Sequence, residues 1–270
     1  MGREDSADES APSGEPQLIA HRGYAAENPE NTVDAMRTAA NDDRTDAIEI
    51  DARATRDDRV VVFHDDDLSR LTDAPSAVPD TPIRQLSYAE LSEYTVGDSD
   101  EAIPLLADAL AAIPESLTVN IELKQPGCEG LQFGAVDDDE ARTAAAARWR
   151  PFVDRVLDIA ADTGHEILYS SFYEGALAAT NNADSGLAVA PIVADSAATA
   201  VALADRYGAT AVHPSIDLVV DTDLVATAHD AGYRVNAWTA TNPADATVLA
   251  TAGVDGIIAD TPAVIAAYPL

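Results

Sequence analysis

The sequence is short of basic residues, and of lysine above all. It contains 16 Lys and Arg residues against 48 Asp and Glu, and Lys124 is its only lysine. The resulting net charge of −32 repels nucleic acid and anionic lipid surfaces, so we expect neither as a partner. An acidic chain that uses arginine in place of lysine is typical of proteins from salt-rich, halophilic cytoplasms, and we predict such an origin here.

Cysteine, aromatic residues and long apolar runs are also scarce. The single Cys128 excludes an internal disulfide. No apolar run approaches the ~18 residues that suggest a membrane span, and residues 1–17 lack the basic and apolar regions of a secretory signal. We therefore expect a cytoplasmic protein without stable membrane association. Residues 1–16 are acidic and carry Ser, Pro and Gly, and we predict that they are disordered.

The remaining chain, residues 17–270, alternates apolar strand-like runs with alanine-rich helical stretches. Nine strands are predicted, at 18–23, 47–55, 59–65, 117–124, 166–172, 187–193, 210–215, 233–239 and 254–260. Helices are predicted at 31–42, 87–94, 104–113, 138–163, 174–180, 196–206, 222–231 and 243–252. This alternation indicates βαβ units around a parallel sheet, and the length of 270 residues suits one (β/α)₈ barrel domain.

Nine strands are one too many for an eight-stranded barrel. Only residues 56–58 separate the second predicted strand from the third, too few for the crossover that parallel strands need. We therefore predict a hairpin that sets Asp51 opposite His64. The predicted fold class is α/β, a (β/α)₈ TIM barrel with one extra hairpin strand after strand 2. The long loops 66–103 and 125–137 follow strands with candidate site residues and are placed to line a pocket.

Three carboxylates point towards one predicted mouth. Active sites of such barrels lie at the carboxyl ends of the strands. Glu49 and Asp51 share one face of the second strand, and Glu122 lies on the strand "LTVNIELK" that follows the hairpin. Three adjacent carboxylates repel one another unless a cation lies between them, and all-oxygen ligation favours Mg²⁺ or Ca²⁺. We therefore predict that these three residues bind a divalent metal ion.

Two histidines and two cations complete the predicted site. His21 ends the first strand and His64 ends the hairpin strand, so one could accept a proton while the other donates one. Arg22 offers a forked cation suited to phosphate, and Lys124, on the same strand face as Glu122, offers a compact one. These groups together point to an anionic phosphodiester as the substrate.

Several nearby residues have two interpretations each. Trp238 is either a pocket wall or an ordinary core aromatic residue. His213 could reach the mouth from the sixth barrel strand, although we favour packing in the core. Glu30 either lies in the first turn of a helix or orients a neighbouring site group. Asn31 or Thr32 is expected to cap the same helix.

The motifs "AHRGYAAENPENT", "IEIDARATRDDRVVVFHDDDLSRLTD", "IELK", "SF" and "NAWT" together resemble the glycerophosphodiester phosphodiesterase family, from about residue 18 onwards. The resemblance implies a TIM barrel that uses a divalent metal to hydrolyse glycerophosphodiesters to glycerol phosphate and an alcohol, through a cyclic phosphate. It implies acid/base roles for His21 and His64, metal binding by Glu49, Asp51 and Glu122, phosphate contacts from Arg22 and Lys124, and a glycerol pocket lined by Phe172 and Trp238. The hairpin turn "RDDR" lacks the glycine that is usual in the family.

Two alternatives stay open at this point. A phospholipase C-like or D-like enzyme acting on intact lipids would also use paired histidines in a barrel, but no basic patch or amphipathic anchor supports it. A non-catalytic barrel that binds a ligand would be expected to lack a histidine or a metal carboxylate, and none is missing. The sequence neither chooses between Mg²⁺ and Ca²⁺ nor predicts an oligomeric state.

Overall fold

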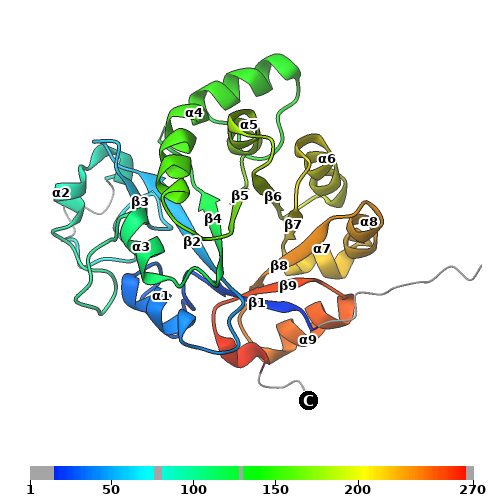
Figure 1. Ribbon diagram of the computed structural model, residues 1–270, viewed down its shortest axis with the longest axis horizontal. Helices are drawn as coiled ribbons and strands as arrows, with labels where there is room; N and C mark the ends of the chain where they lie inside the picture. The colour runs from blue at the N-terminus through cyan, green and yellow to red at the C-terminus, as the bar shows by residue number, and fades with distance from the viewer. Residues whose placement is uncertain (1–14, 76–80, 128–129, 266–270) are drawn as a thin grey trace, which may run out of the picture.

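The protein, described by a computed structural model at residues 15–75, 81–127 and 130–265, is built around a closed parallel barrel (Figure 1). Pairing of the first two strands, β1 with β2, closes the ring. Residues 1–14 and Cys128 lie outside the described residues, and so does most of the predicted disordered segment. The eight barrel strands are β1 (Gln17–His21), β2 (Ala47–Ala54), β4 (Thr118–Leu123), β5 (Ile167–Ser171), β6 (Ala188–Val193), β7 (Ala211–Pro214), β8 (Arg234–Ala240) and β9 (Gly256–Ala259).

Helices surround the barrel, as Figure 1 shows in a view along its axis. They are α1 (Val33–Ala40), α3 (Leu106–Ala112), α4 (Asp139–Ala161), α5 (Glu174–Ala183), α6 (Ala197–Tyr207), α7 (Ile216–Asp221), α8 (Leu224–Asp230) and α9 (Pro243–Ala252), followed by a 3₁₀ turn, η2 (Pro262–Ile265). The predicted barrel is therefore confirmed. In the part of the chain that the structure describes, none of the helices has the length and apolar character needed to cross a membrane.

Strand β2 shows how burial positions the site. All eight of its residues are buried. Ile48 and Ile50 pack in the main core, where each buried side chain contributes ~1.5–3 kcal/mol. The alternate residues, Glu49 and Asp51, therefore face the barrel interior. A slip of one residue would expose the isoleucines to the polar interior, so apolar packing fixes the direction of the carboxylates.

The ninth strand, β3 (Val60–Val62), pairs antiparallel with β2 as predicted, but the predicted register is wrong by one residue. Phe63, and not His64, lies opposite Asp51, and its backbone N–H donates to the Asp51 carbonyl at 2.9 Å. The reason is the turn at residues 56–58. The predicted register centres this turn between Asp57 and Asp58, whereas the observed pairing centres it on Asp57. Asp58 adopts a φ of 60°, a left-handed conformation that aspartate tolerates better than most residues, so the turn forms without glycine.

A second, smaller core is formed around β3, the 3₁₀ turn η1 (Ile83–Gln85) and α2 (Tyr88–Leu91). Figure 1 shows β3 and α2 outside the ring of barrel strands. The buried members of this core come from β3, from Phe63 directly after it and from the segment 66–103: Val61, Phe63, Leu68, Leu71, Ile83, Leu86, Leu91, Val96 and Ile103. This core gives the long irregular segment apolar burial of its own. It therefore anchors the chain that carries His64 and the residues after it.

Candidate active site

A pocket of about 140 Å³ lies at the carboxyl ends of the barrel strands. Eight of the nine predicted site residues line it, and Asp51 lies fully buried beside them, with 0% of its surface exposed. The lining residues are His21, Arg22, Glu49, His64, Asn120, Glu122, Lys124, Phe172, Ile192, His213, Trp238, Thr239 and Ile258. Residues from segments far apart in the sequence thus meet at one mouth.

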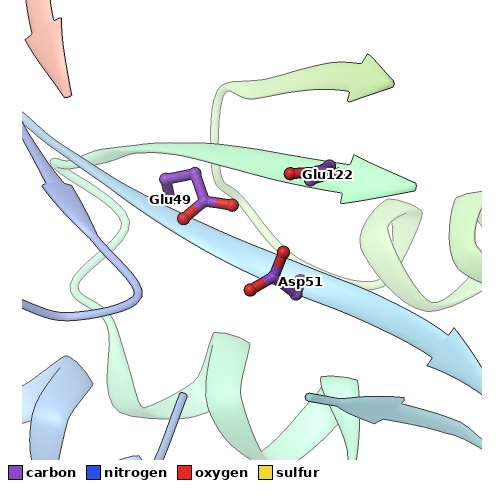
Figure 2. A group of neighbouring side chains, drawn as sticks. All are labelled: Glu49, Asp51 and Glu122. Atoms are coloured by element: carbon purple, nitrogen blue, oxygen red, sulfur yellow. The ribbon is translucent and has the colours of Figure 1, made fainter. Parts of the chain in front are cut away.

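The three predicted carboxylates form one cluster. Figure 2 shows them on two neighbouring strands, Glu49 and Asp51 on β2 and Glu122 on β4. In the sheet register Asp51 lies directly beside Glu122, and Glu49 lies beside Asn120. One oxygen from each carboxylate lies within 4.8 Å of the others. This spacing allows a single cation to contact all three side chains.

The electrostatics of the cluster fit such a cation. Glu49 Oε1 and Asp51 Oδ1 are buried and accept no hydrogen bond. Burial, followed by the charges of Asp51 and Glu122, raises the pKa of Glu49 well above its usual range. Buried oxygens without a donor are costly, and a divalent ion with oxygen ligands would satisfy them. The donor set is the one that Mg²⁺ and Ca²⁺ prefer.

Two cationic side chains lie against the same carboxylates. Lys124 Nζ donates to Glu122 Oε1 at 2.8 Å and lies 3.4 Å from Asp51 Oδ1, and Arg22 Nε lies 3.3 Å from Asp51 Oδ2. Burial disfavours the charged form of Lys124, but Asp51 and Glu122 outweigh it and raise the pKa of the lysine. Burial also disfavours ionised Asp51, yet Lys124 and Arg22 hold the pKa of this carboxyl below its usual range. Both cations are therefore held charged at the pocket.

Two of the pocket histidines, His21 and His64, are each oriented by an aspartate. His21 Nδ1 donates to Asp260 Oδ1 at 2.5 Å, and His64 Nδ1 donates to Asp65 Oδ1 at 2.6 Å. Such a bond fixes the tautomer and leaves Nε2 as the nitrogen for proton transfer. Burial lowers the pKa of His64; Asp51 opposes this shift, and the charges of Lys124 and Arg22 add to it.

An ion network links the His64–Asp65 pair to Arg22, the candidate for phosphate binding. Arg70 donates to both oxygens of Asp65, at 2.7 and 2.8 Å, and to both oxygens of Glu30, at 3.0 Å. Glu30 in turn accepts from Arg22 Nη1 at 2.7 Å, which favours the second of its two interpretations, that it orients Arg22. Arg70 and Asp260 were not predicted as site residues, because only the fold brings them to Glu30 and to His21. Asp65 was placed at the end of the hairpin strand beside His64, but its role in orienting the ring was not predicted.

Hydrogen bonds from neighbouring residues hold two of the site residues, His64 and Asp51, in place. Arg53 donates twice to the carbonyl of His64, at 2.9 and 2.7 Å, and so holds the backbone of that histidine. Thr32 caps helix α1, as predicted. Asn31 does not cap the helix; its φ is 62°, and its side chain donates to Asp51 Oδ2 at 2.8 Å.

The opposite wall of the pocket is apolar. The rings of Phe172 and Trp238 meet edge to face, with centroids 5.4 Å apart. Trp238 lines the pocket, so this indole is a pocket wall and not only a core residue. Its Nε1 donates to the carbonyl of His213 at 2.8 Å, which fixes the ring. His213 is buried beside Asn236 yet also lines the pocket, and burial lowers its pKa to about 3. It is therefore neutral at physiological pH.

Several known proteins are similar to this chain over most of its length. The uncharacterised protein YqiK of Bacillus subtilis is 29% identical over 257 residues, 91% of this chain and 95% of that protein. A glycerophosphodiester phosphodiesterase of Bacillus altitudinis is 27% identical over 255 residues, with 91% and 95% coverage. An Oleispira antarctica phosphodiesterase, solved in complex with the product sn-glycerol-3-phosphate, superposes with a TM-score of 0.77 at 27% identity, covering 93% of this chain and 95% of its own. A model of the glycerophosphoryl diester phosphodiesterase family matches residues 21–264, so the chain belongs to that family.

Proposed function

We propose that this protein hydrolyses glycerophosphodiesters to glycerol phosphate and an alcohol, with a divalent metal, two histidines and a cyclic phosphate intermediate. The observation that carries the proposal is the arrangement of the two histidines. Each is oriented by its own aspartate, and both line the pocket that also holds the three-carboxylate cluster. This arrangement offers two separate proton-transfer groups beside one metal site.

Glu49, Asp51 and Glu122 would hold the metal. When bound, Mg²⁺ or Ca²⁺ would supply Lewis acidity towards the oxygens of the reacting phosphate and glycerol. Arg22 and Lys124 are both charged, and each lies against Asp51 of the carboxylate cluster. They would bind the phosphate and stabilise the negative charge that develops on it. Phe172 and Trp238 would contact the carbon face of the glycerol moiety.

In the first step, Nε2 of one histidine takes the proton of the glycerol 2-hydroxyl, and the resulting oxygen attacks phosphorus. The bond from phosphorus to the alcohol oxygen breaks, and the other histidine gives its proton to that oxygen. In the second step, water opens the cyclic phosphate with the two roles reversed. Each proton transfer contributes ~10²–10⁴ to the rate.

Metal removal tests the metal assignment directly. We expect EDTA to abolish hydrolysis of a glycerophosphodiester, and added Mg²⁺ or Ca²⁺ to restore it in the wild type. Glu49→Gln and Glu122→Gln should lose at least ~100-fold in kcat/KM and should bind the metal more weakly by calorimetry. Glu140→Gln, a change at an exposed carboxylate of α4, is the matched control and should keep wild-type activity.

Full activity in metal-stripped enzyme would exclude metal-dependent catalysis. Binding of several diesters without turnover, with either metal, would favour a non-catalytic barrel instead. We also propose that the protein functions at high salt. This proposal rests on its net charge of −32 and its single lysine.

A further inference from the structure

Arg70, in the motif "DDDLSRLTD", lies outside the active-site pocket and contacts two carboxylates from different parts of the chain. Its Nε and Nη2 donate to the two oxygens of Asp65, at 2.7 and 2.8 Å. Its Nη1 and Nη2 donate to the two oxygens of Glu30, both at 3.0 Å. Such forked pairs fix orientation as well as distance. All three guanidinium nitrogens are therefore used, and Nη2 is used twice.

The two oxygens that Arg70 Nη2 contacts are the same ones that hold site residues. Asp65 Oδ1 also accepts from His64 Nδ1, at 2.6 Å. Glu30 Oε1 also accepts from Arg22 Nη1, at 2.7 Å. A single nitrogen of Arg70 is therefore separated by one carboxylate oxygen from the proposed proton-transfer histidine, and by another from the proposed phosphate ligand.

The backbone around Arg70 is fixed by the second core. Leu68 and Leu71 are both buried members of that core. Thr72 closes the turn between them, because its backbone N–H and its hydroxyl both donate to the carbonyl of Leu68, at 3.2 and 2.8 Å. A fixed backbone lowers the entropic cost of holding the guanidinium against two carboxylates.

The two carboxylates depend on Arg70 for their orientation. Glu30 is 9% exposed and Asp65 is 22% exposed at the side chain, so water replaces lost donors only in part. Burial favours the neutral form of Asp65, but hydrogen bonds from Arg70 and His64 lower its pKa to about 2, so it is a carboxylate. Without Arg70, each carboxylate would lose two hydrogen bonds and could turn away from its site residue.

We propose that Arg70 is a positioning residue that holds the imidazole of His64 and the guanidinium of Arg22 in one fixed relative arrangement. The inference rests on the proposed function, which gives proton transfer to His64 and phosphate binding to Arg22. It adds that the two roles are coupled, because the nitrogen that fixes one carboxylate also fixes the other. A misplacement of ~1 Å between a proton-transfer group and a phosphate costs on the order of 100-fold in rate, so this coupling acts on catalysis.

Steady-state kinetics of the metal-loaded enzyme on glycerophosphocholine give the first test. Arg70→Gln removes the charge and the fork. We expect it to lower kcat ~10–100-fold through His64 and to raise KM roughly three- to tenfold through Arg22. Arg70→Lys keeps the charge without the fork and should recover part of both constants.

Arg44→Gln is the matched control. Arg44 is 45% exposed, against 50% for Arg70, and it also forms a fork on a partly buried aspartate, Asp42. Its pair does not line the active-site pocket, so both constants should stay at wild-type values. Equal losses in Arg70→Gln and Arg44→Gln, or wild-type constants in Arg70→Gln, would overturn the positioning role.

A double-mutant cycle tests the coupling itself. The effects of Asp65→Asn and Glu30→Gln on kcat/KM should deviate from independence by at least ~threefold in the wild-type background, and should become independent in Arg70→Gln. Independent effects in both backgrounds would show that Arg70 does not join the two arms of the network.

Nitrogen NMR of the imidazole of His64, assigned with a His64→Gln variant, needs no turnover. We expect one tautomer, with the proton on Nδ1, in the wild type and a mixture of tautomers in Arg70→Gln. An unchanged tautomer in Arg70→Gln would overturn the action on His64, whether or not the enzyme is active. Failure of the wild type to hydrolyse the diester, with the tautomer shift present, would instead overturn the proposed function.

Discussion

Lys124 lies where a compact cation contacts two carboxylates at once, Glu122 at 2.8 Å and Asp51 at 3.4 Å, with only 12% of its side chain exposed. The chain uses arginine at every other cationic side-chain position apart from histidine, so the retention of lysine here is informative. A guanidinium is broader and planar, and this narrow, buried position suits a point charge.

We therefore expect Lys124→Arg to lower kcat at least ~10-fold, because the broader cation would displace the carboxylates and the phosphate from their positions. Steady-state kinetics on a glycerophosphodiester would measure the change. Arg150→Lys, an exchange in an exposed i,i+4 ion pair of α4, is the control and should leave kcat unaltered. Wild-type kcat and KM in Lys124→Arg would show that the single lysine is incidental to catalysis.

Asp260 lies at the end of β9 and orients His21 through a bond of 2.5 Å. We expect Asp260→Asn to lower kcat ~10–100-fold with little change in KM, because an amide can stabilise the wrong tautomer of the imidazole. Asp255→Asn provides a matched control. Asp255 accepts from His229 Nε2 at 2.8 Å, in a pair that does not line the active-site pocket. If both variants lose activity equally, the loss reflects stability and not the orientation of His21.

At the scale of elements, Glu174 of α5 joins three of the helices that surround the barrel. This fully buried carboxylate accepts from Arg142 of α4 at 2.6 Å, from Arg206 of α6 at 2.7 Å and from the Tyr207 hydroxyl at 2.8 Å. It also accepts from the backbone N–H of Val136, in the loop between β4 and α4. Burial opposes ionisation, but these bonds lower the pKa of Glu174, so it is a carboxylate in the native state.

Glu174→Gln should lower the free energy of unfolding by ~1–3 kcal/mol, because an amide cannot accept all of these hydrogen bonds. Urea denaturation would measure the change. Asp139→Asn is the control: Asp139 also pairs with Arg142 but is fully exposed, so its loss should change the free energy of unfolding much less than the loss of Glu174. Equal, small effects in the two variants would mean that Glu174 does not anchor the loop.

Elements with strong periodicity were predictable, and those set by local turn geometry were less so. All nine predicted strands are present, because each apolar run is buried on one or both faces of the barrel wall. The hairpin register was off by one because a left-handed Asp58 has no marker in the sequence as clear as glycine. Helix α7 was not predicted. It has six residues, capped by Ser215, and the predicted pattern contained only one helix between β7 and β8.

At the scale of the whole molecule, there are 48 acidic residues and only 16 basic ones. The repulsion among the acidic side chains opposes the compact folded state. Salt shortens the range of this repulsion, from ~10 Å at 0.1 M to ~3 Å at 1 M. We expect the Tm to rise by several degrees as KCl increases between these concentrations. KCl is preferred to sulfate, which strengthens apolar burial whatever the charge of the protein. A Tm that is flat or falls with KCl would contradict the proposed adaptation to high salt.

The sequence by itself determined the barrel and eight pocket-lining candidates, because apolar periodicity fixes which face of each strand is buried and, with it, the direction of the polar residues between. Only the tertiary structure decided which residues distant in the sequence become their partners. Asp260 meets His21 across 239 positions of sequence, and Arg70 reaches Glu30 across 40. Hydrogen bonds of this kind depend on ångström-scale distances between loops, and no pattern along the chain encodes those distances.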